Sequence, residues 1–172
     1  MIPMIVDSIR ANIIDIHPSR VMLLREQDGP RYLALVIGNG EADAIAVRLQ
    51  NQEVPRPLTH DLLNKMVEDL GGSVVRVAIT ELMDTTYFAT IFLDINGMPY
   101  ELDARPSDAV ALAIRADVPI LVHPEVLDQA GFEPDQDGEE STLDEGEIVP
   151  EEKLGVFREF INELDLDDLG KT

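Results

Sequence analysis

The chain has 172 residues, 45% of them hydrophobic and 27% charged, which is typical of a globular protein with one domain and a sizeable core. It contains no cysteine, which excludes disulfides and thiolate metal sites, and no apolar run approaches the ~20 residues of a membrane-spanning helix. The N-terminus lacks the apolar segment of a signal peptide, so we expect a cytoplasmic protein without a membrane association.

The net charge of −21 is unevenly distributed along the chain. Residues 1–124 carry 17 acidic against 10 basic side chains (net −7), and residues 125–172 carry 17 against 3 (net −14). Proteins that bind duplex nucleic acid usually present a basic face, because neutralising phosphates supplies most of their non-specific affinity. We therefore do not expect tight binding to double-stranded nucleic acid.

The first half of the chain predicts three strands followed by two helices. β-Branched and apolar residues indicate strands at 4–15, 20–26 and 32–38, and the turn before the second strand contains His17 and Pro18. A helix is expected over 41–50, where apolar residues recur at helical spacing: Ala42, Ile45, Ala46 and Leu49. The next helix is expected to begin at Thr59 as its N-cap and to bury one apolar face: Leu62, Leu63, Met66, Val67 and Leu70.

The second half predicts a β-rich section followed by two helices. Its strands are expected at 73–82, 85–95, 98–104 and 118–122, with an Asn96-Gly97 turn before the third. Its helices are expected over 106–116 and 124–130. Strands and helices mix without a regular βαβ repeat, which predicts an α+β fold: one compact domain over 1–132, with a mixed or antiparallel sheet and packed helices.

The C-terminal residues have a different composition. Residues 133–150 are strongly acidic with little apolar content, which predicts a flexible linker. Residues 151–166 predict an amphipathic helix, which needs a docking partner in its own domain or in another protomer. Its apolar residues at helical spacing are Leu154, Phe157, Ile161 and Leu164.

The stretch DARPSDA, residues 103–109, crowds polar groups against the start of an apolar helix, and it has two interpretations. In the structural one, Pro106 occupies the first turn, Ser107 and Asp108 accept bonds from free helix amides, and Arg105 pairs with an acid. In the functional one, carboxylates at a strand end and a helix start flank an arginine suited to a phosphate or carboxylate.

A second polar pair, His60 and Asp61, also has two interpretations. The structural one is an exposed first-turn histidine beside an acid that favours the helix dipole. The functional one is a general base or metal ligand with an orienting acid, although adjacent residues do not share a helix face. The three histidines are too widely spaced for a zinc site, so oxygen ligands would favour Mg²⁺ or Mn²⁺.

Three blocks of sequence in this order resemble the bifunctional nuclease domain family, and the resemblance spans about residues 1–130. The blocks are IGNGEADAIAVRLQNQEVPRPLTHDLL, VRVAITELMDTTYFATIFL and ELDARPSDAVALAIRADVPILV. The resemblance implies a compact α+β fold, homo-oligomers and nuclease activity on DNA and RNA, as assigned to plant members. The positions that match its motifs are Glu41, His60, Asp61, Asp103, Arg105, Ser107 and Asp108.

From this resemblance we expect metal-assisted hydrolysis of phosphodiester bonds, with single-stranded nucleic acid as a substrate. Asp103, Asp108 and Glu41 would hold Mg²⁺ or Mn²⁺. The catalytic positions would be His60, as the general base, together with Asp61, Ser107 and Arg105, which would stabilise phosphate charge. The alternative is a non-enzymatic regulatory or protein-interaction module with an acidic tail.

Overall fold

The computed structural model describes residues 1–12 and 19–133, which form an eight-stranded mixed sheet with four helices. Neighbouring strands follow the order β6-β5-β4-β7-β1-β2-β3-β8 and are antiparallel except for the parallel pair β4–β7. The elements in chain order are β1 (Ile2–Asn12), β2 (Ser19–Glu26), β3 (Tyr32–Ile37), α1 (Asn39–Leu49), α2 (Thr59–Asp69), β4 (Gly72–Met83), β5 (Thr86–Ile95), β6 (Met98–Ala104), α3 (Pro106–Ala116), β7 (Ile120–Val122), α4 (Pro124–Ala130) and β8 (Gly131–Phe132). The predicted α+β class is confirmed.

The elements predicted within the described residues are present, with shifts at their ends. Helices α3 and α4 begin and end at the predicted residues, α1 begins at Asn39 rather than residue 41, and the two-residue strand β8 was not predicted. The predicted turn residues His17 and Pro18 lie outside the described residues, as do the predicted linker, apart from Glu133, and the predicted helix over 151–166. No helix in the described part is long and apolar enough to cross a membrane.

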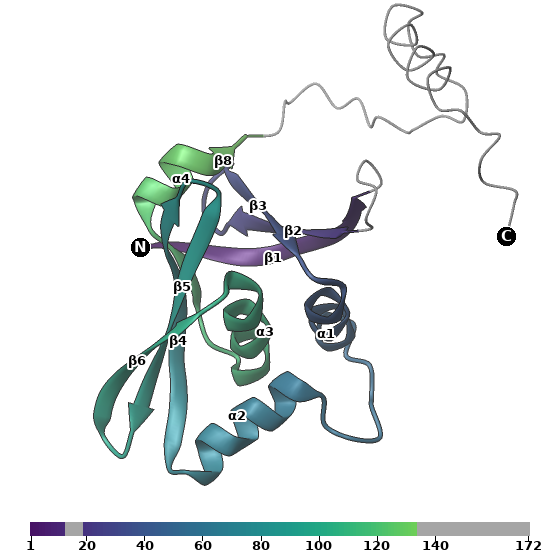
Figure 1. Cartoon of the computed structure of the whole chain (residues 1–172), viewed down its shortest axis with the longest axis vertical. Helices are drawn as coiled ribbons and strands as arrows, with labels where there is room; N and C mark the ends of the chain where they lie inside the picture. Colours follow the sequence, from purple (N-terminus) through teal and green to yellow (C-terminus); the bar gives the residue numbers. More distant parts are fainter. Residues whose placement is uncertain (13–18, 134–172) are drawn as a thin grey trace, which may run out of the picture. The chain divides into compact units, whose positions relative to one another are not determined.

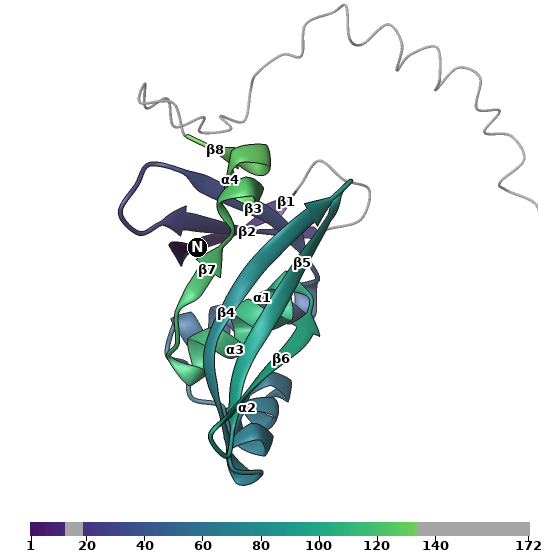
Figure 2. The same cartoon turned by 90° about the vertical axis from the view of Figure 1, so that its left-hand side faces the viewer.

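The short strand β7 joins two halves of the sheet (Figures 1 and 2). One edge of β7 pairs antiparallel with Ile2–Met4 of β1, and the other pairs in parallel with Val77–Ile79 of β4. In Figure 1, β1 and β2 run across the long direction of β4 and β5, and α3 lies in the angle between them. Three residues of β7 therefore connect the β4–β5–β6 half to the β1–β2–β3 half.

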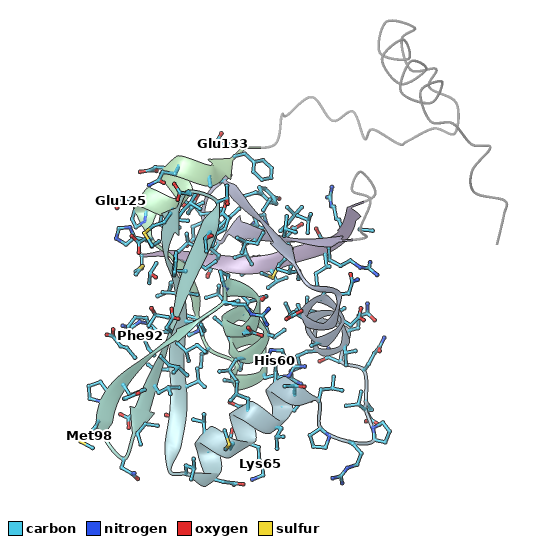
Figure 3. The ribbon with its side chains drawn as sticks, in the orientation of Figure 1. His60, Lys65, Phe92, Met98, Glu125 and Glu133 are labelled. Carbon is cyan, nitrogen blue, oxygen red and sulfur yellow. The ribbon has the colours of Figure 1, made fainter. Side chains whose placement is uncertain are left out.

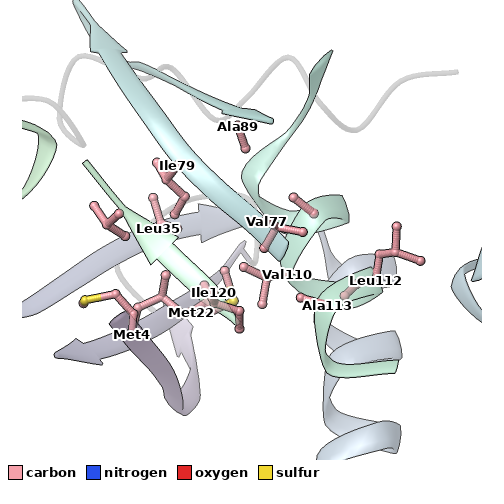
Figure 4. Packing of buried hydrophobic residues seen from close by; sticks show 14 of the residues in the cluster. Met4, Met22, Leu35, Val77, Ile79, Ala89, Val110, Leu112, Ala113 and Ile120 are labelled. Carbon is pink, nitrogen blue, oxygen red and sulfur yellow. The ribbon is translucent and has the colours of Figure 1, made fainter. Parts of the chain in front are cut away.

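The hydrophobic core lies between the sheet and α3 (Figure 4). Five successive residues of α3, Ala109 to Ala113, are at most 1% exposed, so this helix is enclosed on every side. Side chains from both halves of the sheet, among them Met22, Val77 and Ile120, join the same cluster. The start of α3 is therefore fixed in position by the core, and this matters for the polar residues that precede it.

The predicted buried face of α2 was largely wrong. Leu62, Met66 and Leu70 are 62%, 52% and 70% exposed, whereas Leu63 and Val67 pack against the core. The apolar residues of α2 cover too wide an arc for periodicity to select which part faces inward. The N-cap of α2 is Leu58, and Thr59, the predicted cap, is the first residue of the helix. The Asp61 carboxylate accepts a bond from the backbone amide of Leu58.

Candidate functional site

Four polar side chains meet where α1, α2 and α3 begin. We call this set the polar network: Glu41, His60, Arg105 and Asp108. Arg105 donates from Nη2 to Glu41 (2.6 Å) and from Nε to Asp108 (2.6 Å), and the other oxygen of Asp108 lies 3.1 Å from His60 Nε2. Figure 3 shows His60 at the end of α2 that approaches α1 and α3. The network therefore joins residues that are up to 67 positions apart in the sequence.

The polar network lines a cleft of about 690 Å³. Its walls come from one side of α1, the first turn of α2, the loop before α2, and the start of α3. The lining residues are Gly40, Glu41, Asp43, Ala44, Val47, Pro57, Leu58, Thr59, His60, Arg105 and Asp108. A concave site with convergent polar groups is the usual form of a binding or active site.

Asp108 is committed to two side chains and not to helix amides. Arg105 is the N-cap residue of α3, and no side chain caps this helix, so the predicted capping by Ser107 and Asp108 was wrong. Burial opposes ionisation of Asp108, but the hydrogen bonds from Arg105 and His60 and the charge of Arg105 outweigh it and lower its pKa. The same contacts with Asp108 and Glu41 raise the pKa of Arg105.

His60 is buried, with 7% of its surface exposed, which corrects the interpretation of an exposed first-turn histidine. A carboxylate only accepts hydrogen bonds, so Nε2 carries the proton that faces ionised Asp108, and Nδ1 of neutral His60 keeps its lone pair. Nδ1 is buried and has no hydrogen-bond partner in the described residues. A buried polar atom without a partner is unfavourable in a purely structural histidine and points to a functional one.

Asp61 turns away from His60 and belongs to a separate contact. Its two oxygens accept bonds from the Leu58 amide and from Nε of Arg115. Burial opposes its ionisation, but these two donors outweigh that effect and lower the pKa of Asp61. Arg115, whose side chain is 4% exposed, also donates to the carbonyl oxygens of Ala111 and Ala44.

Arg115 thus ties together α1, α2 and α3 behind the cleft. Sequence reasoning missed this residue. The available signal was a single arginine, Arg115, at the end of an otherwise apolar helix. The helix pattern showed that α3 is enclosed, and an enclosed arginine needs a carboxylate and carbonyl acceptors.

Ser107 and Asp103 lie apart from the cleft. Ser107 is 7% exposed and lines a smaller hollow of about 290 Å³ on the other side of Arg105, with Thr85 and Thr86. Asp103 is exposed on β6, opposite Thr90 of β5. The structure therefore brings together four of the seven motif positions and leaves Asp61, Asp103 and Ser107 outside the cleft.

Comparison with known proteins places these residues in a family. The model of the bifunctional nuclease domain matches residues 22–135, which include the whole polar network. The chain belongs to the bifunctional nuclease domain family.

The chain is similar to relatives of two kinds, an uncharacterized bacterial protein and plant nucleases. An uncharacterized protein of Mycobacterium tuberculosis is 44% identical over 153 residues, 88% of this chain and 89% of the relative. Bifunctional nuclease 1 of Oryza sativa subsp. japonica is 31% identical over 63% of this chain and 34% of its own length. Bifunctional nuclease 1 of Arabidopsis thaliana is 28% identical over 74% and 41%. The chain thus spans well under half the length of the plant nucleases that it matches.

The divalent ion expected from the family resemblance does not fit these side chains as they are arranged. The guanidinium of Arg105 already lies between Glu41 and Asp108, and both oxygens of Asp108 are engaged. Asp103, the third expected ligand, lies on β6 and does not line the cleft. Within residues 1–12 and 19–133, no three His, Asp or Glu side chains are grouped as a cation site requires.

Proposed function

We propose that this chain is a nuclease that hydrolyses phosphodiester bonds of single-stranded nucleic acid in the cleft, with His60 as the general base. The observation that carries the proposal is the 3.1 Å contact between His60 Nε2 and Asp108, together with a buried Nδ1 that has no partner in the described part of the chain. A histidine held by a carboxylate in a cleft is a recurrent general-base arrangement. Family membership and the names of the plant relatives support the choice of substrate class.

In the proposed reaction, Nδ1 of His60 takes a proton from a water molecule whose oxygen attacks phosphorus. The new P–O bond forms as the bond to the leaving oxygen breaks, and imidazolium returns its proton to that oxygen. Asp108 holds the ring in the required tautomer and stabilises the imidazolium. Because Nδ1 is enclosed, the reaction requires a movement of the cleft wall that admits water.

Arg105 is the cleft residue suited to phosphate. Its side chain is 67% exposed, and its Nε and Nη2 are held by the two carboxylates. Nη1 has no bond to a described residue and can donate to a phosphate oxygen. The carboxylates fix the direction in which this remaining donor points.

The charge of the cleft favours a substrate that places few phosphates in it. Three carboxylates, Glu41, Asp43 and Asp108, line it together with a single guanidinium, that of Arg105. Each phosphate bound here gains little from cations, so affinity has to come from few phosphates and from base contacts. Short single-stranded oligonucleotides meet this condition better than duplexes.

The test is cleavage of labelled single-stranded DNA and RNA by the highly purified full chain, with Mg²⁺, with Mn²⁺ and with EDTA. His60→Gln and Asp108→Asn should lower the rate by roughly 10²-fold or more, the usual contribution of a general base. His123→Gln is the matched control, because His123 caps α4 away from the cleft and should be replaceable without loss. All variants are first shown to be folded by circular dichroism. Cleavage that persists in folded His60→Gln would disprove the role of His60.

A second candidate function is a non-enzymatic interaction module, which the surplus of carboxylates around the cleft favours. Carboxylates repel phosphates and attract basic groups. An absence of cleavage in every metal condition, together with salt-sensitive binding of a lysine-rich peptide that Glu41→Gln weakens, would support this function over the nuclease.

A further inference from the structure

Strand β6 forms one end of the sheet and has a free edge. Among residues 1–12 and 19–133 it pairs only with β5, and every residue from Met98 to Asp103 is exposed. At the other end of the sheet, the edge strand β8 has only two residues. An edge strand of seven residues that no described element covers is a template for pairing with another chain.

The turn before β6 determines which backbone groups are free. Asn96 and Gly97 both have positive φ, 53° and 82°, as in a two-residue hairpin turn, and Ile95 pairs with Met98 across it. Since bonded and non-bonded pairs alternate along an antiparallel ladder, Met98, Tyr100 and Leu102 bond to β5. The backbone groups of residues 99, 101 and 103 then point away from β5. Pro99, which has no N–H, stands at one of these outward positions and removes no bond from the ladder.

One face of β6 is apolar. Met98, Tyr100 and Leu102 are 67%, 57% and 42% exposed, and Met98 lies at the outer tip of the β5–β6 hairpin (Figure 3). They stand opposite Ile95, Leu93 and Ile91 of β5, whose side chains belong to the core or pack against it. The apolar face of β6 therefore continues the core side of the sheet out to an uncovered edge, and exposed apolar rows of this kind mark interaction sites.

The other face of β6 is acidic. Glu101 and Asp103 stand opposite Phe92 and Thr90, and neither carboxylate forms an ion pair with a described residue. A strand that pairs with β6 would place alternate side chains beside these two carboxylates. Two copies of β6 paired antiparallel would bring their carboxylates together, so charge favours a basic partner over a second copy.

We propose that the free edge of β6 docks an extended segment of a partner protein in which apolar residues alternate with Lys or Arg. The free N–H groups of Glu101 and Asp103 and the carbonyl groups of residues 99, 101 and 103 pair with the backbone of this segment. Its apolar side chains lie beside Tyr100 and Leu102, and its cations lie beside Glu101 and Asp103. This is strand addition with alternating side-chain recognition, and it uses no residue of the cleft.

The experiment is fluorescence anisotropy of the full chain with a labelled peptide of alternating valine and lysine. Two comparison peptides have the same composition in two separate blocks, and alternating valine and glutamate. The alternating valine–lysine peptide should bind best and should shift the NMR amide signals of residues 98–104. The double variant Glu101→Lys with Asp103→Lys should weaken its binding by about tenfold or more and should favour the glutamate peptide instead.

The matched control is Glu53→Lys with Glu133→Lys, which changes the net charge equally at exposed positions outside β6. This control should bind the alternating valine–lysine peptide with an affinity within about twofold of that of the natural chain, since distant exposed charges are screened. An equal loss in both double variants would show general charge attraction and overturn the proposal. So would the absence of binding, or a homodimer that sedimentation detects and that excludes the peptide from β6.

Discussion

Asp108 links His60 to the rest of the polar network, because its two oxygens bind different partners. One faces His60 and the other accepts a bond from Arg105, which is itself held by Glu41. If Asp108 were uncharged, His60 would lose the acceptor that fixes its tautomer, and Arg105 would lose one of its two anchors. The state of the whole polar network therefore depends on the ionisation of one carboxyl group.

This dependence predicts a pH effect on stability. The pKa of Asp108 in the folded protein lies below its ordinary value of 3.8, so the unfolded chain binds the proton more tightly. The stabilisation from Asp108 is complete well above 3.8 and is lost as the pH falls through the lower folded pKa. The difference in unfolding free energy between the natural chain and Asp108→Asn should therefore shrink between about pH 6 and about pH 3.

Urea unfolding followed by circular dichroism at the two pH values measures that difference. Glu53→Gln is the control, since Glu53 is exposed and forms no ion pair with a described residue, and it should show little difference at either pH. A gap between the natural chain and Asp108→Asn that stays constant with pH would contradict the role given to Asp108.

At the scale of single residues, sequence could identify the motif positions but not their partners. His60 and Asp61 are neighbours in the sequence, yet their side chains bind Asp108 and Arg115 on α3. Since successive side chains on a helix point about 100° apart, only the packing of three helices decides what each one meets. Asp103 and Asp108 are likewise close in the sequence, but one lies on an open strand edge and the other in the cleft.

At the scale of elements, Arg115 holds three helices together. Its guanidinium binds Asp61 at the start of α2, the Ala44 carbonyl of α1 and the Ala111 carbonyl of its own helix. The same three helices line the cleft, so we expect this contact to hold the cleft walls in position. Arg115 is therefore a positioning residue for His60 and Glu41.

Replacing Arg115 by methionine should destabilise the domain by roughly 2–4 kcal/mol, because Asp61 and two carbonyl groups lose a buried donor. Arg115→Lys keeps the charge but cannot reach all three acceptors, so its free energy of unfolding should lie between those of the natural chain and Arg115→Met. Chemical denaturation measures both variants. If the free energy of unfolding of Arg115→Met changes by less than about 0.5 kcal/mol, the range of ordinary surface substitutions, the contact does not stabilise the domain.

The elements themselves could be predicted to the extent that their signals are local. The proline at the start of α3 and the Asn96-Gly97 turn fix boundaries through backbone conformation, and both were predicted. The inward face of α2 could not be predicted, because Leu62 and Leu63 satisfy the same helical pattern and only docking selects Leu63. β8 has two residues, too few for any periodic signal.

At the scale of the molecule, β7 joins two half-sheets into one eight-stranded sheet. Its residues Ile120 and Val122 are buried in the core that both halves share. The order of strands in the sheet could not be read from the sequence, since β7 inserts between β1, which ends at Asn12, and β4, which begins 60 residues later at Gly72. Such pairing depends on long-range packing and leaves no pattern in any one segment.

Native-state hydrogen exchange should show that the two half-sheets unfold together. The slowest amides of β1 and β2 and those of β4 and β5 should exchange with the same free energy of opening, equal to that of global unfolding. Val122→Ala should lower the value for both halves equally, by about 1–3 kcal/mol, since it removes buried methyl groups from the shared core. If only one half responds, the two halves open independently.

The position of β7 in the chain also has a consequence for biosynthesis. As the chain leaves the ribosome, β1 and β4 emerge long before residues 120–122, and each then carries an edge that β7 will later occupy. Until Val122 leaves the ribosome, β1 and β4 each lack this strand partner, and an unpaired strand edge is the kind of surface that chaperones bind. Domain folding must therefore wait for the last strands of the domain to be synthesised.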